Sequence, residues 1–475
     1  MRPLPGVEDM SATARKPYKT IKLPAYLVND TLVVQWGLGA IPPVLVNEAK
    51  LSLWKDQRAL LNELTKTLSR GSNPRHLPAT GGKTPDAVRI SLGQDIFETL
   101  INSDRISAWN KSSNPAEAHV RLVFEYDGAA AERMAQIPLE GLCSGRPMLT
   151  NVADELVLAR VSIVRQIRNG RTLKAVDLEP PMKVLVFAPK PASSNQQVLD
   201  IEAELEGMRT VEKESAGAIQ FHFVEPGKAT FARLANEPAE FHVFHFCGHG
   251  DVSSRGGRLL FENQDRTEDW RDVSQVIQLL ANQNGRNTRL VVLNGCETAA
   301  VSVFATEFPA VVGMQFRISD EAAKHFADGF YRELAASGHL DDAVWMARRK
   351  MNENHSPYWS EHITPVLYMN SEDGLVLRVA PKLLVWNLEN LEIGRPYDRL
   401  LEAHGGRPPY RWEADNLPNG MRLDPETGRL HGAPSAAGAT SIRVRVKTID
   451  GVSSEAVLPL NIRGGTLQIL DEIIE

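Results

Sequence analysis

Cysteine is scarce in this chain. The 475 residues include only Cys143, Cys247 and Cys296. An odd and sparse set of cysteines excludes a disulfide framework and a four-cysteine zinc ribbon, and it is typical of a reducing compartment. We therefore expect three free thiols, any of which can be buried in the core or available for chemistry.

Long hydrophobic runs are lacking as well. The most apolar window, residues 32–46, is interrupted by Gln35, Pro42 and Pro43, so it does not supply the about 20 apolar residues of a membrane-spanning helix. Residues 1–20 carry scattered basic side chains with no apolar stretch behind them, which argues against a secretory signal. The sequence predicts no membrane association and a cytoplasmic location.

An excess of positive charge is also missing, since 53 Lys and Arg stand against 59 Asp and Glu, for a net charge of −6. This balance excludes a uniformly basic surface for nucleic acid and a polybasic membrane anchor. We expect partners to be proteins or small molecules, with no nucleic acid bound directly. The length predicts roughly three domains.

Patterning divides the chain. Residues 18–46 favour short strands, residues 50–68 show helical spacing of leucines, and residues 71–85 are typical of a linker, with a boundary near residue 80. Apolar strands then alternate with helices; the clearest strands are residues 120–126, 182–188, 219–224, 241–247 and 289–293. This alternation predicts an α/β fold with a parallel sheet, whose chemistry lies beyond the carboxyl ends of the strands.

The carboxyl-terminal part has a different pattern. After Val379 helical periodicity disappears, and residues 383–462 show turn dipeptides between short alternating strands. This pattern predicts a small β-sandwich. Residues 464–475 are interpreted as an acidic tail.

Two strand ends carry residues suited to chemistry. One apolar strand stops at Gly248-His249-Gly250, and another ends in Asn294-Gly295-Cys296. The 47 residues that separate His249 from Cys296 leave room for one crossover helix between neighbouring parallel strands. A histidine near a cysteine can remove its proton and create a nucleophilic thiolate, and the amides of Gly250 and Cys296 could hold an oxyanion.

The motifs HFCGHGD (245–251) and LNGCETA (293–299) resemble those of the CHAT family, caspase-like domains related to separases. The resemblance extends over roughly residues 88–379 and includes Ile137–Glu140, where Leu139 stands in place of a usual tryptophan. It implies a caspase-like α/β/α sandwich with a mostly parallel sheet. An inactive half would occupy residues 81–180, with residues 1–80 in it or packed on it, and the catalytic half residues 181–380. Residues 383–463 resemble a bacterial immunoglobulin-like module that serves binding or spacing, and the tail would be residues 464–475.

The resemblance implies a cysteine endopeptidase in which His249 is the base and Cys296 the nucleophile, with no metal or organic cofactor. It also implies a substrate pocket near Glu297 and Asp320, where a carboxylate would select Arg or Lys before the scissile bond. Asp320 could equally cap a helix over residues 321–336. Relatives serve as effectors in bacterial antiviral defence or cell death, which implies a protein substrate and an activating partner or regulatory subunit.

Other interpretations remain open from the residues alone. His245, Cys247 and His249 fall on one face of a strand and could bind a metal, although His245 fits a structural role beside the dyad better. The polar segment 251–272 could gate the cleft. The caspase-like body could also be an inactive scaffold that presents the sandwich domain to a partner.

Overall fold

The computed structural model describes most of the chain: residues 18–36, 41–69, 84–102, 105, 119–143, 161–168, 175–194, 196, 199–238, 240–253, 256–284, 287–298, 307–353, 361–371, 376–384, 388–449 and 451–464. Almost all of the predicted linker 71–85 and of the predicted tail 464–475 lies outside these residues. No helix in the described parts is long and apolar enough to cross a membrane.

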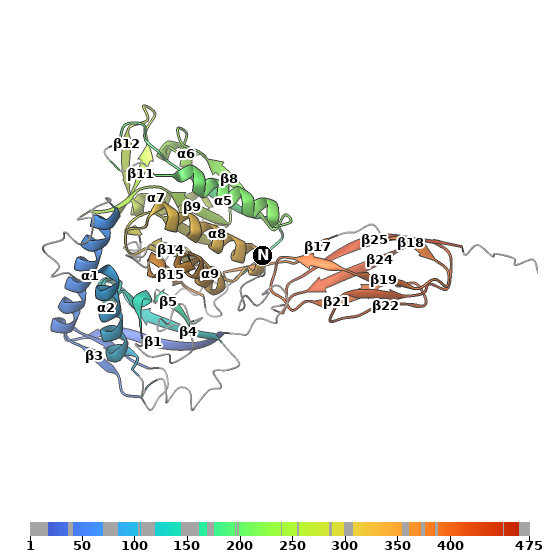
Figure 1. Cartoon of the computed structure of the whole chain (residues 1–475), viewed down its shortest axis with the longest axis horizontal. Coiled ribbons are helices and arrows are strands. Elements are labelled where there is room, and N and C mark those ends of the chain that lie inside the picture. Colours follow the sequence, from blue (N-terminus) through green and yellow to red (C-terminus); the bar gives the residue numbers. More distant parts are fainter. Residues whose placement is uncertain are drawn as a thin grey trace, which may run out of the picture.

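The centre of the molecule is one large sheet (Figure 1). Its inner strands are fully buried and rich in Val, Leu and Phe, as expected for strands covered on both faces. In spatial order the strands are β3 (Val44–Val46), β2 (Thr31–Val34), β1 (Tyr18–Val28), β4 (His119–Tyr126), β5 (Val161–Ile167), β15 (Pro365–Met369), β14 (Ala310–Met314), β13 (Leu290–Asn294), β9 (Val243–Cys247), β7 (Met182–Phe187) and β8 (Ile219–Val224).

The sheet consists of two parallel halves that run in opposite directions. β1, β4, β5 and β15 are mutually parallel, and so are β14, β13, β9, β7 and β8. The antiparallel pair β14–β15 joins the halves, and β2 and β3 extend the far edge as antiparallel strands. The predicted α/β architecture with a mostly parallel sheet is confirmed, and the strands of residues 18–46 continue the same sheet.

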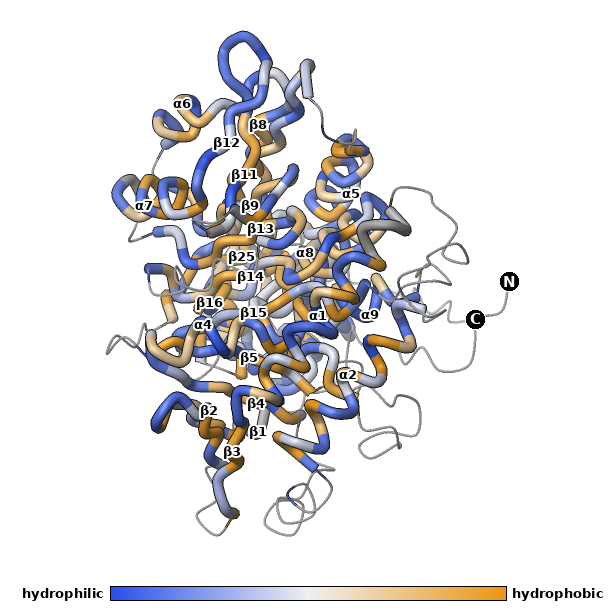
Figure 2. The backbone as a smooth tube through the Cα atoms, turned by 90° about the vertical axis from the view of Figure 1, so that its left-hand side faces the viewer, coloured by the Kyte–Doolittle hydropathy of each residue, from blue (hydrophilic) through white to orange (hydrophobic). Residues whose placement is uncertain are grey.

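Helices cover both faces. α5 (Ile201–Glu214), α8 (Asp320–Ser337) and α9 (Leu340–Glu353) share one hydrophobic core with the sheet. On the other face the core contains side chains of α1 (Glu48–Ser69), α2 (Pro85–Leu100), α4 (Gly128–Gln136), α6 (Phe231–Leu234) and α7 (Val273–Asn284). Figure 2 shows the hydrophobic residues concentrated in the central strands, while the helices alternate between hydrophobic and hydrophilic faces. The result is a three-layer α/β/α body.

The polar segment 251–272, which the sequence suggested could gate the cleft, is mostly a three-stranded antiparallel sheet. β10 (Gly250–Ser253), β11 (Gly256–Glu262) and β12 (Glu268–Asp272) pair in that order. Leu259, Leu260 and Phe261 of β11 are buried, and Leu259 and Phe261 belong to a hydrophobic core of the body. A gating role for the segment stays a prediction. This small sheet begins directly after His249.

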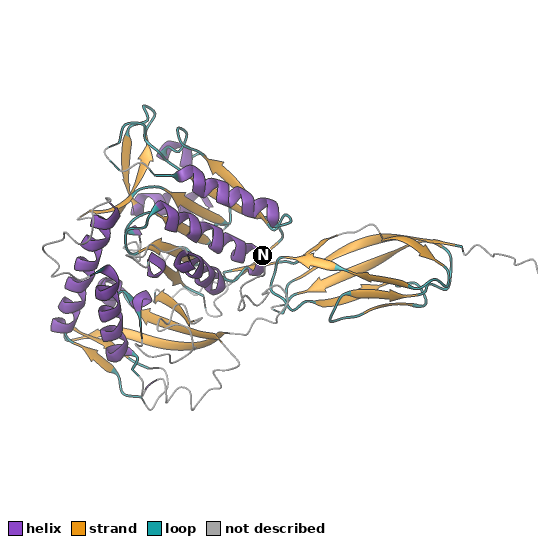
Figure 3. Ribbon diagram, viewed as in Figure 1, coloured by secondary structure: helices purple, strands orange, loops and turns teal. Residues whose placement is uncertain are grey.

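The described residues of the carboxyl-terminal part form a separate β-structure, and none of them is helical (Figure 3). A four-stranded sheet faces a three-stranded one, and the two enclose their own core, which includes Trp412, Ile442 and Val444. The predicted small β-sandwich is confirmed. Its strands are β18 (Leu388–Glu392), β25 (Ser453–Arg463), β24 (Gly438–Lys447) and β21 (Arg411–Asp415) in one sheet, β19 (Tyr397–Leu400), β23 (Arg429–Gly432) and β22 (Met421–Leu423) in the other, with β17 (Lys382–Leu384) and β20 (Glu402–His404) paired at the junction with the body.

Candidate active site

The two strands that were predicted to end in reactive residues, β9 before His249 and β13 before Cys296, are neighbours in the sheet. β9 and β13 pair in parallel, and their register sets Cys247 opposite Asn294. The residues that follow each strand therefore leave the sheet side by side, Gly248 and His249 on one and Gly295 and Cys296 on the other. The fold brings His249 and Cys296 to one pocket, which both of them line.

Glycine is required where the two turns meet. A Cβ atom at Gly250 would lie 2.4 Å from the carbonyl oxygen of Cys296, and one at Gly295 would lie 2.6 Å from the carbonyl oxygen of Gly248. Such distances are far inside van der Waals contact, so a larger residue would push the turns apart. The backbone of Gly250, predicted to contribute to an oxyanion hole together with Cys296, thus lies directly against the cysteine turn.

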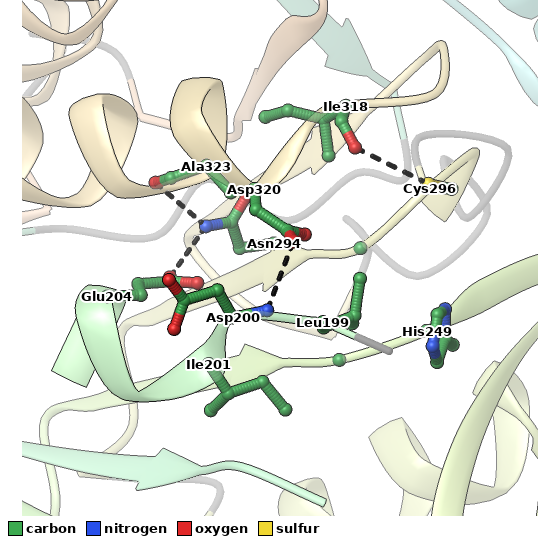
Figure 4. A pocket seen from close by; sticks show the side chains of 12 residues that line it. Leu199, Asp200, Ile201, Glu204, His249, Asn294, Cys296, Ile318, Asp320 and Ala323 are labelled. Carbon is green, nitrogen blue, oxygen red and sulfur yellow. Dashed lines mark hydrogen bonds between the residues drawn. The ribbon is translucent and has the colours of Figure 1, made fainter. Parts of the chain in front are cut away.

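The Cys296 thiol is partly shielded. Its Sγ donates to the carbonyl oxygen of Ile318 at 3.9 Å, and Figure 4 shows the sulfur turned toward that oxygen. Burial raises the pKa of the Cys296 thiol, although the Ile318 contact and the nearby Arg317 act in the opposite direction. At neutral pH the sulfur is therefore a thiol that needs a base before it can act as a nucleophile.

The pocket beside the thiol is lined by carboxylates. Asp200, Glu204 and Asp320 contribute to a space of about 380 Å³, which includes its open mouth. Ten of the lining residues are labelled in Figure 4, and the full set is Leu199, Asp200, Ile201, Glu204, Gly248, His249, Asn294, Gly295, Cys296, Ile318, Asp320 and Ala323. A pocket of this kind suits a positively charged group.

Asp320 lies in the pocket and not at the cap of the helix. α8 begins at Asp320, and the residue that caps it is Ser319, whose hydroxyl accepts from the amide of Ala322 at 3.2 Å. The Asp320 carboxylate instead accepts from the backbone amide of Asp200 at 3.0 Å. The alternative that Asp320 caps the helix was wrong, because the shorter serine side chain one residue earlier already satisfies the amide.

Glu297 points away from this pocket. Its carboxylate accepts from Asn62 of α1 at 2.7 Å, and it is not among the residues that line the pocket. Its φ of 57° is in the left-handed region that disfavours side chains. A direct role for Glu297 in substrate binding stays a prediction, and this geometry gives it no contact with the pocket.

A second carboxylate holds the segment that follows β14. Glu361, in the short helix η7 (Glu361–Ile363), accepts from the backbone amide of Ser319 at 2.6 Å and from its hydroxyl at 2.7 Å. Burial raises the pKa of Glu361 against these bonds, and the nearby Asp320 adds to the increase. Glu361 thus fixes the segment that carries the Ile318 carbonyl.

Glu204 is the centre of a buried network beside the pocket that His249 and Cys296 line. Its Oε1 lies 3.2 Å from His245 Nε2, and it accepts from Cys247 Sγ at 3.3 Å and from Asn294 Nδ2 at 2.7 Å. The other ring nitrogen of His245 lies 2.7 Å from the Tyr331 hydroxyl. The network connects β9, β13, α5 and α8, and it orients Asn294 two residues before Cys296.

This network is also where a metal could bind. Glu204, His245 and Cys247 have ligand atoms within 4.8 Å of one another, whereas the predicted alternative combined His245 and Cys247 with His249. His249 lies beyond the end of β9 and lines the pocket, so it does not complete that set. The three buried groups already satisfy one another by hydrogen bonds, and burial together with Glu204 raises the pKa of the Cys247 thiol far above its usual range. This arrangement fits a structural network without a metal.

The sequence reasoning missed Glu204, Asp200 and Glu361. For Glu204 a signal existed, because it occupies the same apolar face of α5 as Ile201, Leu205 and Met208, where an acid needs a buried partner. Glu361 carries no comparable signal, since its partner Ser319 is 42 residues away in the chain.

The fold and site define a caspase-like α/β protein with a cysteine and a histidine at the carboxyl ends of neighbouring parallel strands. The family model for the CHAT domain matches residues 91–413, which is more than half of the chain. The chain therefore belongs to the CHAT domain family, and this membership together with the caspase-like fold points to a cysteine protease. Residues 390–463 match the family described as "Putative Ig domain", which agrees with the β-sandwich.

The chain is also similar to several solved structures. The complex of pro- and mature domains of RgpB from Porphyromonas gingivalis is 10% identical over 80% of this chain and 96% of that one, with a TM-score of 0.40. The separase–securin complex of Saccharomyces cerevisiae is 11% identical over 71% of this chain and 23% of that one, with a TM-score of 0.32. A "putative alpha-galactosidase/melibiase" from Bacteroides fragilis is 26% identical over 18% of this chain, with a TM-score of 0.17, and this chain spans 17% of its length. No curated protein matches the chain significantly.

Proposed function

We propose that this protein is a cysteine endopeptidase that cleaves a protein substrate with His249 and Cys296. The observation that supports it is the joint position of both residues in one pocket at the ends of β9 and β13. The raised pKa of the Cys296 thiol supports a need for a general base at neutral pH, and His249 in the same pocket is the residue proposed for that role.

The reaction would proceed in two steps. His249 takes the thiol proton, the Cys296 sulfur attacks the scissile carbonyl carbon, and the amides of Gly250 and Cys296 stabilise the oxyanion. His249 then gives the proton to the leaving amine, and a thioester remains on Cys296. Water, deprotonated by His249, attacks the thioester, releases the carboxylic acid and restores the thiol. In the resting geometry the thiol must first leave the Ile318 carbonyl.

The proposal includes a preference for Arg or Lys before the scissile bond. Asp320 supports it, because its carboxylate lines the pocket next to Cys296. A second observation comes from Asn294, whose Oδ1 is buried and has no hydrogen-bond donor among the described residues. A carboxylate and an unsatisfied acceptor in one pocket favour a side chain that carries several N–H groups.

Amino-terminal mapping of cleaved proteins tests the activity. Lysate incubated with the wild type is compared with lysate incubated with Cys296→Ala and His249→Ala, and His222→Ala, an exposed histidine on β8, is the matched control. New protein termini are expected with the wild type and His222→Ala only. Identical profiles for all four proteins would leave the alternative of an inactive scaffold.

The preference is tested with Asp320→Asn. Loss of the charge is expected to lower kcat/KM for substrates with Arg or Lys at the cut by about 10- to 100-fold, in line with the usual strength of a charged hydrogen bond. Glu321→Gln is the control, since Glu321 is the next residue of α8, is exposed and pairs with His325. Cleavage after Asp or apolar residues in the wild type would refute the role of Asp320.

Within the same proposal the protein serves bacterial defence or cell death as an effector that a partner switches on. The shielded Cys296 thiol supports a resting state that needs rearrangement. Basal cleavage by the isolated protein as fast as in the presence of an infected-cell extract would contradict this regulation.

A further inference from the structure

The amino-terminal helix α1 precedes the residues 91–413 that match the CHAT family, yet it contacts the candidate active site. Leu61 and Leu64 of α1 form a small hydrophobic cluster with Phe316 and Ile363. Phe316 lies two residues before Ile318, whose carbonyl binds the Cys296 thiol, and Ile363 belongs to η7, which carries Glu361. α1 therefore packs on the segments that shape the site.

Polar contacts fix the same segments. Asn62 donates to Glu297, the residue directly after Cys296, at 2.7 Å. Arg58, one turn earlier, has its guanidinium 5.6 Å from the centre of the Phe316 ring and donates to the carbonyl oxygen of Gln315 at 3.4 Å. One face of α1 thus holds both the turn that bears the thiol and the segment that the thiol contacts.

The turn at Glu297 needs such support. A residue with a side chain at φ 57° is in an unfavourable backbone conformation and persists only where its surroundings fix it. Two bonds do so: the amide of Glu297 donates to the carbonyl oxygen of Phe316 at 3.3 Å, and its carboxylate accepts from Asn62. Without the second bond, the turn is free to relax and to carry Cys296 away from its present position.

We propose that Asn62 is a positioning residue that sets the conformation of the Cys296 turn through Glu297, and that α1 is a built-in control element of the site. This rests on the proposed function only for its effect on turnover. The effect on the thiol itself concerns the folded protein and needs no substrate. The hydrogen bond also explains why an acidic residue follows the cysteine although it does not line the pocket.

Two measurements on the full-length chain separate these effects. The first is the rate at which iodoacetamide alkylates Cys296 at neutral pH, followed by mass spectrometry for all three cysteines. The second is the kcat and KM for a substrate found by terminal mapping. The variants are Asn62→Ala, Asn62→Asp, which faces Glu297 with a second carboxylate, and the double variant Asn62→Asp/Glu297→Gln, which restores a hydrogen bond of reversed direction. Asp56→Asn, on the exposed side of α1, is the matched control.

Loosening the turn hydrates the thiol and lowers its raised pKa, so Cys296 is expected to react about tenfold faster in both single variants. The kcat is expected to fall about tenfold with KM nearly unchanged, because fewer molecules hold the sulfur in place. The double variant should recover most of both changes. Cys143 and Cys247 are buried in the core and should stay unreactive, whereas unfolding would expose all three thiols.

Unchanged alkylation in Asn62→Asp, or no recovery in the double variant, would overturn the proposal. Altered alkylation in the variants, with no peptide cleavage by the wild type or by any variant, would uphold the positioning role and refute the protease function. Normal cleavage with unchanged thiol reactivity in the single variants would uphold the protease function and refute the positioning role of Asn62. The two proposals therefore fail in different ways.

Discussion

At the scale of single residues, the contact between the histidine and cysteine turns leaves no room for a methyl group at Gly250. We expect Gly250→Ala to lower activity by at least about a hundredfold, since displacement of catalytic groups by about 1 Å has effects of that size. Gly207→Ala in α5 is the control, because a Cβ there meets no atom within 4 Å. That variant should keep its activity and gain up to about 1 kcal/mol of stability. Wild-type turnover by Gly250→Ala would show that the two turns need not touch.

We also expect the reactivity of the Cys296 thiol to depend on pH. Because burial raises its pKa, the thiolate fraction increases only as the pH rises above the ordinary thiol value. The rate of alkylation in the absence of substrate should therefore rise with pH, with a midpoint above 9.0, the value of an unperturbed thiol. Alkylation measured over a pH series checks this. A midpoint near neutrality would instead indicate a preformed ion pair between Cys296 and His249.

The sequence alone was sufficient to predict that His249 and Cys296 lie close together, because each follows a continuous apolar strand and is preceded by glycine. The sequence was insufficient to predict the contacts that Glu204 and Asn62 make near the site. Asn62 contacts Glu297 across 235 residues of chain, and a single sequence contains no information on which distant elements meet. The family resemblance implied a pocket near Glu297, but the position of a residue in the chain does not determine where its side chain points, and Glu297 contacts Asn62.

At the scale of elements, a buried ion pair joins strand β4 of the sheet to helix α9. Arg121 of β4 binds the Asp341 carboxylate of α9 with two hydrogen bonds, one of them from Nε at 3.0 Å, and Ser162 of β5 donates to the same carboxylate. Removal of one partner leaves a buried charge, so Arg121→Met is expected to lower the free energy of unfolding by about 3–5 kcal/mol. Replacement of both, in Arg121→Met/Asp341→Leu, should recover most of it. Denaturant unfolding measures the series, and a double variant less stable than the single one would contradict the argument.

The ion pair of Arg121 and Asp341 is also expected to make the stability of the protein sensitive to acid. Burial acts to raise the pKa of Asp341, but Arg121 and His339 outweigh it and hold the pKa below the ordinary 3.8. A carboxyl group with a lowered pKa in the folded state stabilises the protein above its ordinary pKa, and this contribution is lost as the pH falls toward the folded value. Asp341→Asn should therefore show a flatter decrease of stability below pH 3.8 than the wild type. Parallel curves for the two proteins would refute the contribution.

Helices and strands were predictable where the hydrophobic pattern of their residues fits only one type of secondary structure. The fully buried strands β9 and β13 are continuous apolar runs, and their type follows from that alone. The small sheet β10–β12 was not predictable, because most of its residues are polar and only partly buried, and the few fully buried side chains are those of β11. The antiparallel pairing of β14 and β15 could not be predicted either, because the direction of a strand depends on how the chain crosses the sheet and not on the composition of the strand.

At the scale of the whole molecule, the body and the sandwich have separate hydrophobic cores. Their junction includes the β17–β20 pair and a hydrogen bond from Ser454 to the carbonyl oxygen of Pro381. The division was readable from the sequence, because loss of helical periodicity after Val379 marks a change of architecture. The way in which the sandwich is attached could not be predicted from the sequence, because it depends on close contacts between distant segments. At Gly406, for example, an added Cβ would meet atoms of Pro381 and Thr448.

Separate cores predict separate unfolding. Calorimetry of the full chain should show two transitions, because few contacts couple the body to the sandwich. Ile442→Ala removes a fully buried side chain of the sandwich, with a loss of about 2–5 kcal/mol, and should lower only the sandwich transition, by roughly 10 °C or more. Ile163→Ala in β5 is the matched variant and should lower only the transition of the body. If either substitution shifts both transitions equally, the two parts unfold as one cooperative unit, and the sandwich then contributes to the stability of the candidate active site.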